Sequence, residues 1–455
     1  MDIALNIKLA KSYPVSMFKK LAIFILLTLP SVAIAQSTTQ IVDQGDEKFF
    51  VKDYAGAIKL YTQAIDGNMR FADAYNRRGQ AYFELGDYKN AFNDFTSAIT
   101  ADPSHASYYN RRGISRFKLT DLPGAINDYN NALALDSAFE LAYNNRGLAE
   151  TYLKNYQAAI TDYTRAILFR SEYPEAYFNR AYAKQNIKEF AAALEDYNQA
   201  IAFKPRYKDA YFNRAMLKMR TGNKEGAYVD FTKVIDLDSA SAEAYLNRGV
   251  LKAGQKDYQG ALLDYKKAGE IKPADESLLI NRGIAESAVG DVKSAVKSFN
   301  AAISLNQGNA IAYNNRALAK SQQGDFNGAI ADFNKAIELN KLYADAYNNR
   351  GYAKIQLKAF TTAIADIKTS LKLDSQSAVA YLNLANATAS LKDYKGAVTY
   401  YDKALQIDPN YANAYNNRGL ARYFAGDKAG ACTDMKKATA LEFPAAAGNF
   451  SLYCK

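Results

Sequence analysis

The sequence has no tryptophan, one histidine (His105), two cysteines and nine prolines among its 455 residues. Two cysteines exclude a disulfide-rich scaffold and a multi-cysteine metal cluster, and no metal or cofactor is expected. So few prolines in a chain of this length favour a helical protein with few loops. The chain has no phosphate-cradling glycine loop, no HExxH motif and no CxxC motif. We therefore expect no enzymatic activity and no catalytic residues.

The formal charge is +10, and the 35 N-terminal residues hold four lysines and one aspartate, so the remainder carries +7. Nucleic-acid-binding proteins usually gather their lysines and arginines in clusters. No run of basic residues occurs in this chain. The composition therefore predicts no nucleic-acid partner.

The first 35 residues resemble an export signal. Residues 17–20 (MFKK) carry two lysines, and residues 21–29 are almost entirely apolar. Residues 33–35 (AIA) form a small-residue cleavage site before Gln36. This order is typical of a secretory signal peptide, with Met17 as a possible true start. The alternative, a membrane anchor, needs about 20 apolar residues, more than residues 21–35 provide. We expect an exported, periplasmic or extracellular protein without a transmembrane segment after cleavage.

A repeat of 34 residues runs through the chain without insertion or deletion. The motif AYNRRG at residues 74–79 recurs as close variants at multiples of 34. Twelve units fill residues 38–445, and residues 446–455 form a tail. The units start at residues 38, 72, 106, 140, 174, 208, 242, 276, 310, 344, 378 and 412. Positions below are counted from these starts.

Fixed positions of the repeat hold either small or large residues, and this pattern indicates paired helices. Position 8 is Gly or Ala and position 20 is Ala in all twelve units, whereas position 4 is Tyr in ten. Small residues allow two helices to approach closely, and the large rings fill the space around them. Gly-Asp or Gly-Asn pairs in the middle of five units predict a turn there. Each unit should therefore be two antiparallel helices stacked on the next unit.

This pattern resembles the tetratricopeptide repeat, with Tyr in place of the family's Trp at position 4. The resemblance covers 408 of the 455 residues. It implies an all-α solenoid, a right-handed superhelix of helix-turn-helix repeats. It also implies that the first helix of each pair lines the concave face.

Ten units carry Arg at position 7, and nine of these ten carry Asp at position 23. The units with Gln44 and Leu384 at position 7 lack the Asp as well, so the two positions vary together. Because the two helices of a unit are antiparallel, we predict an ion pair within each unit. A neutralised arginine is a poor phosphate ligand, so this arginine row is interpreted as structural, with Arg282 opposite Ser298 as the exception.

Position 6 is Asn in nine units. The resemblance places these side chains on the concave face, where matching asparagines in related superhelices grip an extended peptide. Alternatively, the amides cap or bridge neighbouring helices. The predicted row comprises Asn145, Asn179, Asn213, Asn247, Asn281, Asn315, Asn349, Asn383 and Asn417.

Positions 5 and 9 of the central units are apolar and lie one turn apart on one helix face. We expect an apolar stripe beside the asparagine row that binds a partner, unless it is simply packing between first helices. A homodimer contact is another use for such a stripe. Its members are Phe178, Tyr182, Phe212, Met216, Leu246, Val250, Ile280 and Ile284.

Cys432 and Cys454 are 22 residues apart, and a disulfide between them would hold the tail over the last repeat. Two free thiols are the alternative. Repeats, signal and tail leave no room for a catalytic domain, so the expected function is a scaffold or adaptor that binds a protein or peptide. There are two alternatives. One is a structural component of the cell envelope that associates with itself as a homo-oligomer. The other is a groove that binds a glycan or another non-protein ligand.

Overall fold

The computed structural model describes residues 37–454, and these contain 25 α-helices and no β-strand. The predicted signal peptide, residues 1–35, lies outside the described residues. The first helices of the twelve repeats begin at intervals of 34 residues. They are α1 (Thr38–Phe50), α3 (Ala72–Glu84), α5 (Ala106–Lys118), α7 (Glu140–Tyr152), α9 (Pro174–Asn186), α11 (Lys208–Arg220), α13 (Ala242–Gly254), α15 (Glu276–Ala288), α17 (Ala310–Gln322), α19 (Ala344–Gln356), α21 (Ala378–Ser390) and α23 (Ala412–Phe424).

The second helix of each repeat follows after a three-residue turn. These helices are α2 (Tyr54–Gly67), α4 (Tyr88–Ala101), α6 (Leu122–Leu135), α8 (Tyr156–Phe169), α10 (Phe190–Phe203), α12 (Lys224–Leu237), α14 (Tyr258–Ile271), α16 (Val292–Leu305), α18 (Phe326–Leu339), α20 (Phe360–Leu373), α22 (Tyr394–Ile407) and α24 (Lys428–Ala440). A short helix, α25 (Ala446–Tyr453), ends the described chain.

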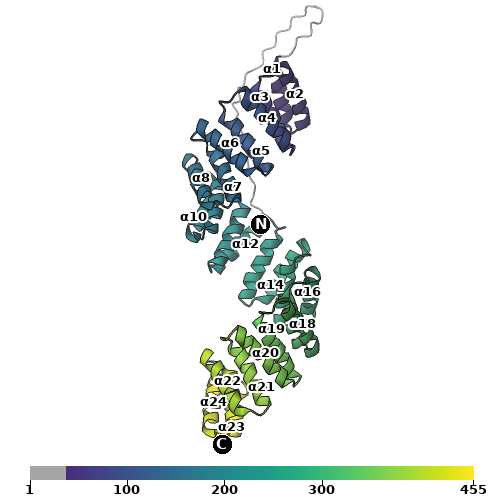
Figure 1. The fold of residues 1–455 in the computed structure, drawn as a ribbon, viewed down its shortest axis with the longest axis vertical. Coiled ribbons are helices and arrows are strands. Elements are labelled where there is room, and N and C mark those ends of the chain that lie inside the picture. Colours follow the sequence, from purple (N-terminus) through teal and green to yellow (C-terminus); the bar gives the residue numbers. More distant parts are fainter. Residues whose placement is uncertain (1–36, 455) are drawn as a thin grey trace, which may run out of the picture. The chain divides into compact units, whose positions relative to one another are not determined.

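The helices form two compact units, one ending at Asp238 and the other beginning at Ser239. Within each unit the two helices of a repeat pack against each other, and each second helix packs on the next first helix. In Figure 1, α20, α21 and α22 lie next to one another in chain order within the second unit. The expected all-α solenoid of stacked helix pairs is thus observed in each unit.

In ten of the twelve repeats an aromatic ring at position 24 packs against small residues in the interior. Tyr129 at position 24 is fully buried, as are its equivalents in most repeats. A Cβ atom added to Gly113 would lie 2.6 Å from the ring of Tyr129, so position 8 of this repeat has no room for a larger residue. Ala125 at position 20 is also fully buried. The close approach of the two helices therefore depends on small residues at both positions.

The turn between the two helices has the same conformation in every repeat. Position 15 has a positive φ in all twelve repeats: Gly in five, such as Gly324 (φ 82°), and Lys or Thr in seven, such as Lys358 (φ 60°). The following residue caps the second helix where it is Asp, as when Asp325 accepts a hydrogen bond from the Gly328 amide at 2.9 Å. The left-handed residue and the cap together reverse the chain.

The tail packs onto the last repeat. Helix α25 contacts α23 and α24, and Cys432 on α24 forms a disulfide with Cys454 directly after α25. The ring of Tyr453 packs against that of Tyr423, with ring centroids 4.7 Å apart and the planes tilted by 55°. The final apolar face of the solenoid is therefore covered by the chain's own C-terminal residues.

Among the described residues, no helix has the length and apolar character that crossing a bilayer requires. The same residues contain no group of three or more His, Cys, Asp or Glu side chains arranged to hold a metal ion.

Candidate interaction surfaces

The arginine row is a set of structural ion pairs. All nine predicted Arg–Asp pairs form; Arg214, for example, donates from Nη2 to Asp230 at 2.6 Å and from Nε at 2.9 Å. Lys218 adds a third bond to the same carboxylate at 2.8 Å. The pairs are Arg78–Asp94, Arg112–Asp128, Arg146–Asp162, Arg180–Asp196, Arg214–Asp230, Arg248–Asp264, Arg316–Asp332, Arg350–Asp366 and Arg418–Asp434.

Two further contacts hold these arginines, and sequence reasoning missed both. Each of the nine lies over the Tyr three residues earlier, as Arg316 does over Tyr313 at 5.3 Å from the ring centroid. Most of them also donate from Nη1 to position 25 of the preceding repeat, as Arg316 does to Asn300 at 2.7 Å. The constant Tyr-x-x-Arg spacing was the available indication of the first contact, because it places both side chains on one helix face.

The asparagine row divides into two groups. In the first group the amide bridges to a neighbouring first helix: Asn145 donates to Asn110 at 3.0 Å and Asn383 to Asn348 at 3.0 Å. Asn179, Asn349 and Asn417 form similar bridges to Asn144, Asn314 and Asn386. Asn145, Asn179 and Asn383 are buried and occupied by the bridge, which favours the alternative interpretation, bridging between helices, over peptide binding for these three.

The second group belongs to repeats where an apolar residue at position 5 of the preceding repeat removes the bridging partner. Asn213, Asn247 and Asn281 each donate to a carbonyl of their own helix at 2.8 Å. Asn315 is half-buried. The carbonyl oxygens of Asn247 and Asn281 accept no hydrogen bond within residues 37–454. These two carbonyl oxygens can therefore accept hydrogen bonds from the backbone of a bound polypeptide.

The predicted apolar stripe is only partly exposed. Phe178 is 2% exposed because its ring packs against Tyr197 and Tyr207, which favours the packing interpretation over a binding surface for this residue. Phe212 is half-buried against Phe231. Tyr182, Met216, Val250 and Ile280 are half-buried as well. Packing between helices, the alternative interpretation, accounts for most of the stripe.

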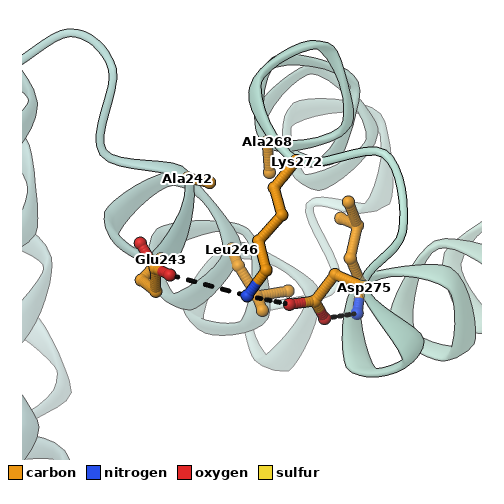
Figure 2. A pocket seen from close by; sticks show the side chains of 7 residues that line it. Ala242, Glu243, Leu246, Ala268, Lys272 and Asp275 are labelled. Atoms are coloured by element: carbon orange, nitrogen blue, oxygen red, sulfur yellow. Dashed lines mark hydrogen bonds and ion pairs between the residues drawn. The ribbon is translucent and has the colours of Figure 1, made fainter. Parts of the chain in front are cut away.

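Leu246 is half-buried beneath an ion-pair bridge. Figure 2 shows Lys272 reaching across Leu246, with Nζ 3.7 Å from Glu243 and 3.0 Å from Asp275. Asp275 also accepts a hydrogen bond from the Leu278 amide at 3.0 Å, which starts α15. The space left beside Leu246 is about 10 Å³, too small for a ligand group.

The exposed part of position 9 lies further along the second unit. Ile284, Leu318 and Tyr352 are 43%, 38% and 44% exposed. They occupy the same position on α15, α17 and α19, and neighbouring first helices in this series contact each other. In other repeats position 9 is buried, as at Ile114 and Leu148 (0% and 3% exposed), or half-buried, as at Tyr182 and Met216. The row of Ile284, Leu318 and Tyr352, here called the position-9 row, is therefore the most open apolar part of this position.

Comparison with known protein families gives a consistent result. Models of the tetratricopeptide repeat match six segments, and a model described as the TPR repeat matches a seventh; together they cover more than half of the chain. The segments are residues 72–105, 110–177, 174–207, 208–241, 310–341, 344–377 and 385–426. The chain belongs to the tetratricopeptide repeat family. No curated protein matches the sequence of this tetratricopeptide repeat protein.

Three solved structures are similar to this chain to different degrees, and the first of them supports the shared fold. The APC/C hetero-tetramer Cut9-Hcn1 is similar with a TM-score of 0.51 at 16% identity, over 92% of this chain and 97% of that chain. Yeast Tom70 has a TM-score of 0.41 at 17% identity, over 89% of this chain and 92% of that one. A tetratricopeptide repeat protein from Parabacteroides merdae has a TM-score of 0.43 at 22% identity, over 55% and 99%. At these identities the similarity concerns the fold alone.

Proposed function

We propose that this tetratricopeptide repeat protein is a non-catalytic scaffold that binds a segment of a protein partner across the first helices of repeats eight to ten. The position-9 row carries the proposal, because three apolar side chains in register are exposed where equivalent apolar residues of the first unit are buried or half-buried. Contiguous exposed apolar side chains commonly mark interaction sites.

Polar groups beside the row fit an extended polypeptide. Asn281 lies on α15, one turn before Ile284, and its amide already donates to the Ser277 carbonyl. Its own carbonyl oxygen therefore suits an N–H group of a bound backbone. Apolar contacts along the row would supply affinity, and this amide would orient the bound segment.

Affinity capture tests the proposal. The bait is the chain from Gln36, compared with a Leu318→Asp/Tyr352→Asp variant and with Leu263→Asp as a matched control. Leu263 is also apolar and 68% exposed, but it lies on a second helix, α14. All three baits are first checked for native helical content by circular dichroism.

The expected result is a protein retained by the unmodified bait and by the Leu263→Asp control but lost by the double variant. Equal retention by all three baits would contradict a site on the position-9 row. Capture of only the chain's own copies would favour a self-associating structural component. Retention of a glycan without a protein would favour a non-protein ligand.

We further propose that the protein is exported, on the basis of the sequence of residues 1–35. The pair of cysteines is compatible with an oxidising compartment. Amino-terminal sequencing of the natural protein is expected to start at Gln36. A mature chain that retains residues 21–35 would contradict cleavage and would favour the membrane-anchor alternative.

A further inference from the structure

The second helices of the second unit carry a lysine-rich stripe. Positions 18, 22, 25, 26 and 29 of a second helix lie on the same side of it, about one turn apart. This side is opposite to positions 20 and 24, which are buried in all twelve repeats. In repeats seven to twelve the five positions hold three acidic residues and eleven lysines. The lysines are Lys266, Lys267, Lys293, Lys297, Lys335, Lys368, Lys372, Lys395, Lys403, Lys436 and Lys437.

The first unit has no such excess of positive charge. At the same five positions its second helices hold four basic and four acidic residues. The contrast extends to the whole of each unit: residues 37–238 contain 26 basic and 26 acidic side chains, whereas residues 239–454 contain 26 basic and 20 acidic ones. These counts include helix caps and buried ion pairs. The net positive charge of the described residues therefore belongs to the second unit.

The carboxylates of the stripe already have partners. Glu270 and Glu338 each pair with the lysine three residues earlier, at 2.9 Å and 2.8 Å, and Asp402 pairs with Arg418 at 2.6 Å. Aspartates that cap these helices accept backbone hydrogen bonds at the helix starts, as Asp291 does at 3.1 Å. The other nine lysines of the stripe are exposed and form no ion pair within residues 37–454. These nine residues are here called the lysine face.

Neighbouring lysines of this face repel one another. Lys293 and Lys297 are four residues apart on α16, as Lys368 and Lys372 are on α20. Like charges at this spacing slightly destabilise a helix. The stability of the fold therefore gives no reason for the arrangement, whereas a ligand of opposite charge would compensate the repulsion.

The composition of the lysine face favours an extended anionic surface over a single acidic group. All nine members are lysines, which act as point charges, whereas arginines bind carboxylates and phosphates in a fixed bidentate geometry. They are distributed over five helices, α14, α16, α20, α22 and α24, and are not gathered around one pocket. Anionic lipid headgroups attract clusters of lysines in this way, without a defined binding geometry.

We propose that the lysine face holds the second unit against an anionic lipid bilayer. The contact is electrostatic and reversible, because the ammonium groups lie at the level of the charged headgroups. The lysine face is on second helices, whereas the position-9 row is on first helices. The protein can therefore bind a membrane and a protein partner through separate surfaces, and the two proposals can fail separately.

Co-sedimentation with lipid vesicles tests the proposal. The protein is the chain from Gln36, because the apolar residues 21–29 would bind lipid by themselves. One set of vesicles contains phosphatidylcholine with about 30% of the anionic lipid phosphatidylglycerol, and the other contains phosphatidylcholine alone. Binding is measured at about 50 mM and about 500 mM NaCl, because salt screens exposed charges.

Two variants with equal losses of charge locate the contact. The lysine-face variant combines Lys293→Gln, Lys297→Gln, Lys368→Gln and Lys372→Gln. The control variant changes to Gln the four basic residues at the same positions of the first unit, which are exposed as well. These four residues are Lys59, Lys89, Arg165 and Lys233. Circular dichroism checks that both variants are folded.

We expect the unmodified chain to bind the anionic vesicles at the lower salt concentration only, and not to bind phosphatidylcholine alone. Each lysine near an anionic surface contributes roughly a factor of five to binding. The lysine-face variant should therefore bind at least about tenfold more weakly, even if some of its lysines do not reach the surface. The control variant should lose less than about threefold, because the first unit lacks the face.

Equal losses in the two variants would overturn the proposal, because net charge and not the lysine face would then explain the binding. Binding that persists at the higher salt concentration, or a folded chain that does not bind the anionic vesicles, would overturn it as well. Duplex DNA and polyglutamate are tested at the lower salt concentration. Retention of either one without vesicle binding would replace the bilayer by a nucleic acid or by an acidic protein.

Discussion

At the residue scale, a buried carboxylate joins the two helices in nine of the twelve repeats. Asp230 is 1% exposed and accepts bonds from Arg214 and Lys218. Replacing Asp230 by Ala leaves two cations without their acceptor, so we expect a loss of about 3–5 kcal/mol in the free energy of unfolding. Urea denaturation measures this loss.

The matched control is Asp402→Ala. Asp402 also bonds to an arginine of the row, Arg418, but its side chain is 50% exposed. An exposed pair contributes about 0–1 kcal/mol, so the control should lose little stability. Equal losses from the two variants would contradict the structural importance of burial in this row.

Glu286 gives repeat eight a distinctive pH dependence. Burial raises the pKa of its carboxyl group, and nearby Asp291 adds to this, while the Ser298 hydrogen bond and Arg282 oppose it. A carboxyl group whose pKa is higher in the folded chain favours folding most below the unfolded-state pKa, roughly 4.3, and loses that contribution as the pH rises through the folded-state value.

The wild-type chain should therefore lose stability relative to Glu286→Gln as the pH rises from roughly 4 into the neutral range. Urea denaturation of both proteins at a series of pH values measures the difference. A difference that is constant with pH, or that changes in the opposite direction, would contradict the raised pKa.

Contacts between two residues were easiest to predict from the sequence where the same pair of residue types recurs in many repeats. Arg at position 7 and Asp at position 23 vary together, so the ion pairs could be predicted without a structure. The burial of Phe178 could not, because the same residue type at the same position, Phe212, is only half-buried. Exposure at position 5 depends on neighbouring rings such as Tyr207, which differ from repeat to repeat.

At the element scale, the turn within each repeat requires a positive φ at position 15, yet seven repeats have Lys or Thr there instead of Gly. Lys358 has a φ of 60°, a region that costs a residue with a side chain about 1–2 kcal/mol. Glycine avoids that cost but adds flexibility to the unfolded chain. We expect Lys358→Gly to raise the free energy of unfolding by roughly 0.5–1 kcal/mol.

The reverse change supplies the control. Gly324 occupies the equivalent position with a φ of 82° and has no atom within 4 Å of an added Cβ. Gly324→Lys should therefore destabilise through backbone conformation and not through a steric clash. Thermal unfolding of both variants should shift in opposite directions, and shifts of the same sign would contradict the assigned turn.

Helix starts and turns were predictable because each depends on local residues: Gly-Asp pairs, caps and a strict period of 34. Bridging between neighbouring helices was one of the two interpretations of the asparagine row, but the sequence did not tell which amides form a bridge, because the bridges join side chains 35 residues apart across two repeats. Asparagine at position 5 was the available indication. It occurs in the repeats preceding Asn145, Asn179, Asn349 and Asn383, and it is replaced by an apolar residue before the unbridged amides.

At the scale of the whole molecule, a solenoid depends on contacts between neighbouring repeats, so its end needs protection. The disulfide between Cys432 and Cys454 closes a loop of 22 residues, which should stabilise the docked α25 by about 3 kcal/mol. Cys454→Ser should therefore increase hydrogen exchange in residues 446–453 and leave residues 37–238 unchanged. Unchanged exchange in α25 would contradict a structural role for the disulfide.

Binding of a protein partner on the position-9 row of the second unit can be measured by site-specific photo-crosslinking in the native host. A photoreactive amino acid is placed at residue 318 and, as the control, at residue 263. We expect crosslinking to the same protein from residue 318 and from a further probe at residue 352, but not from residue 263. Crosslinks to that protein from residue 263 alone, or none from residues 318 and 352, would contradict it.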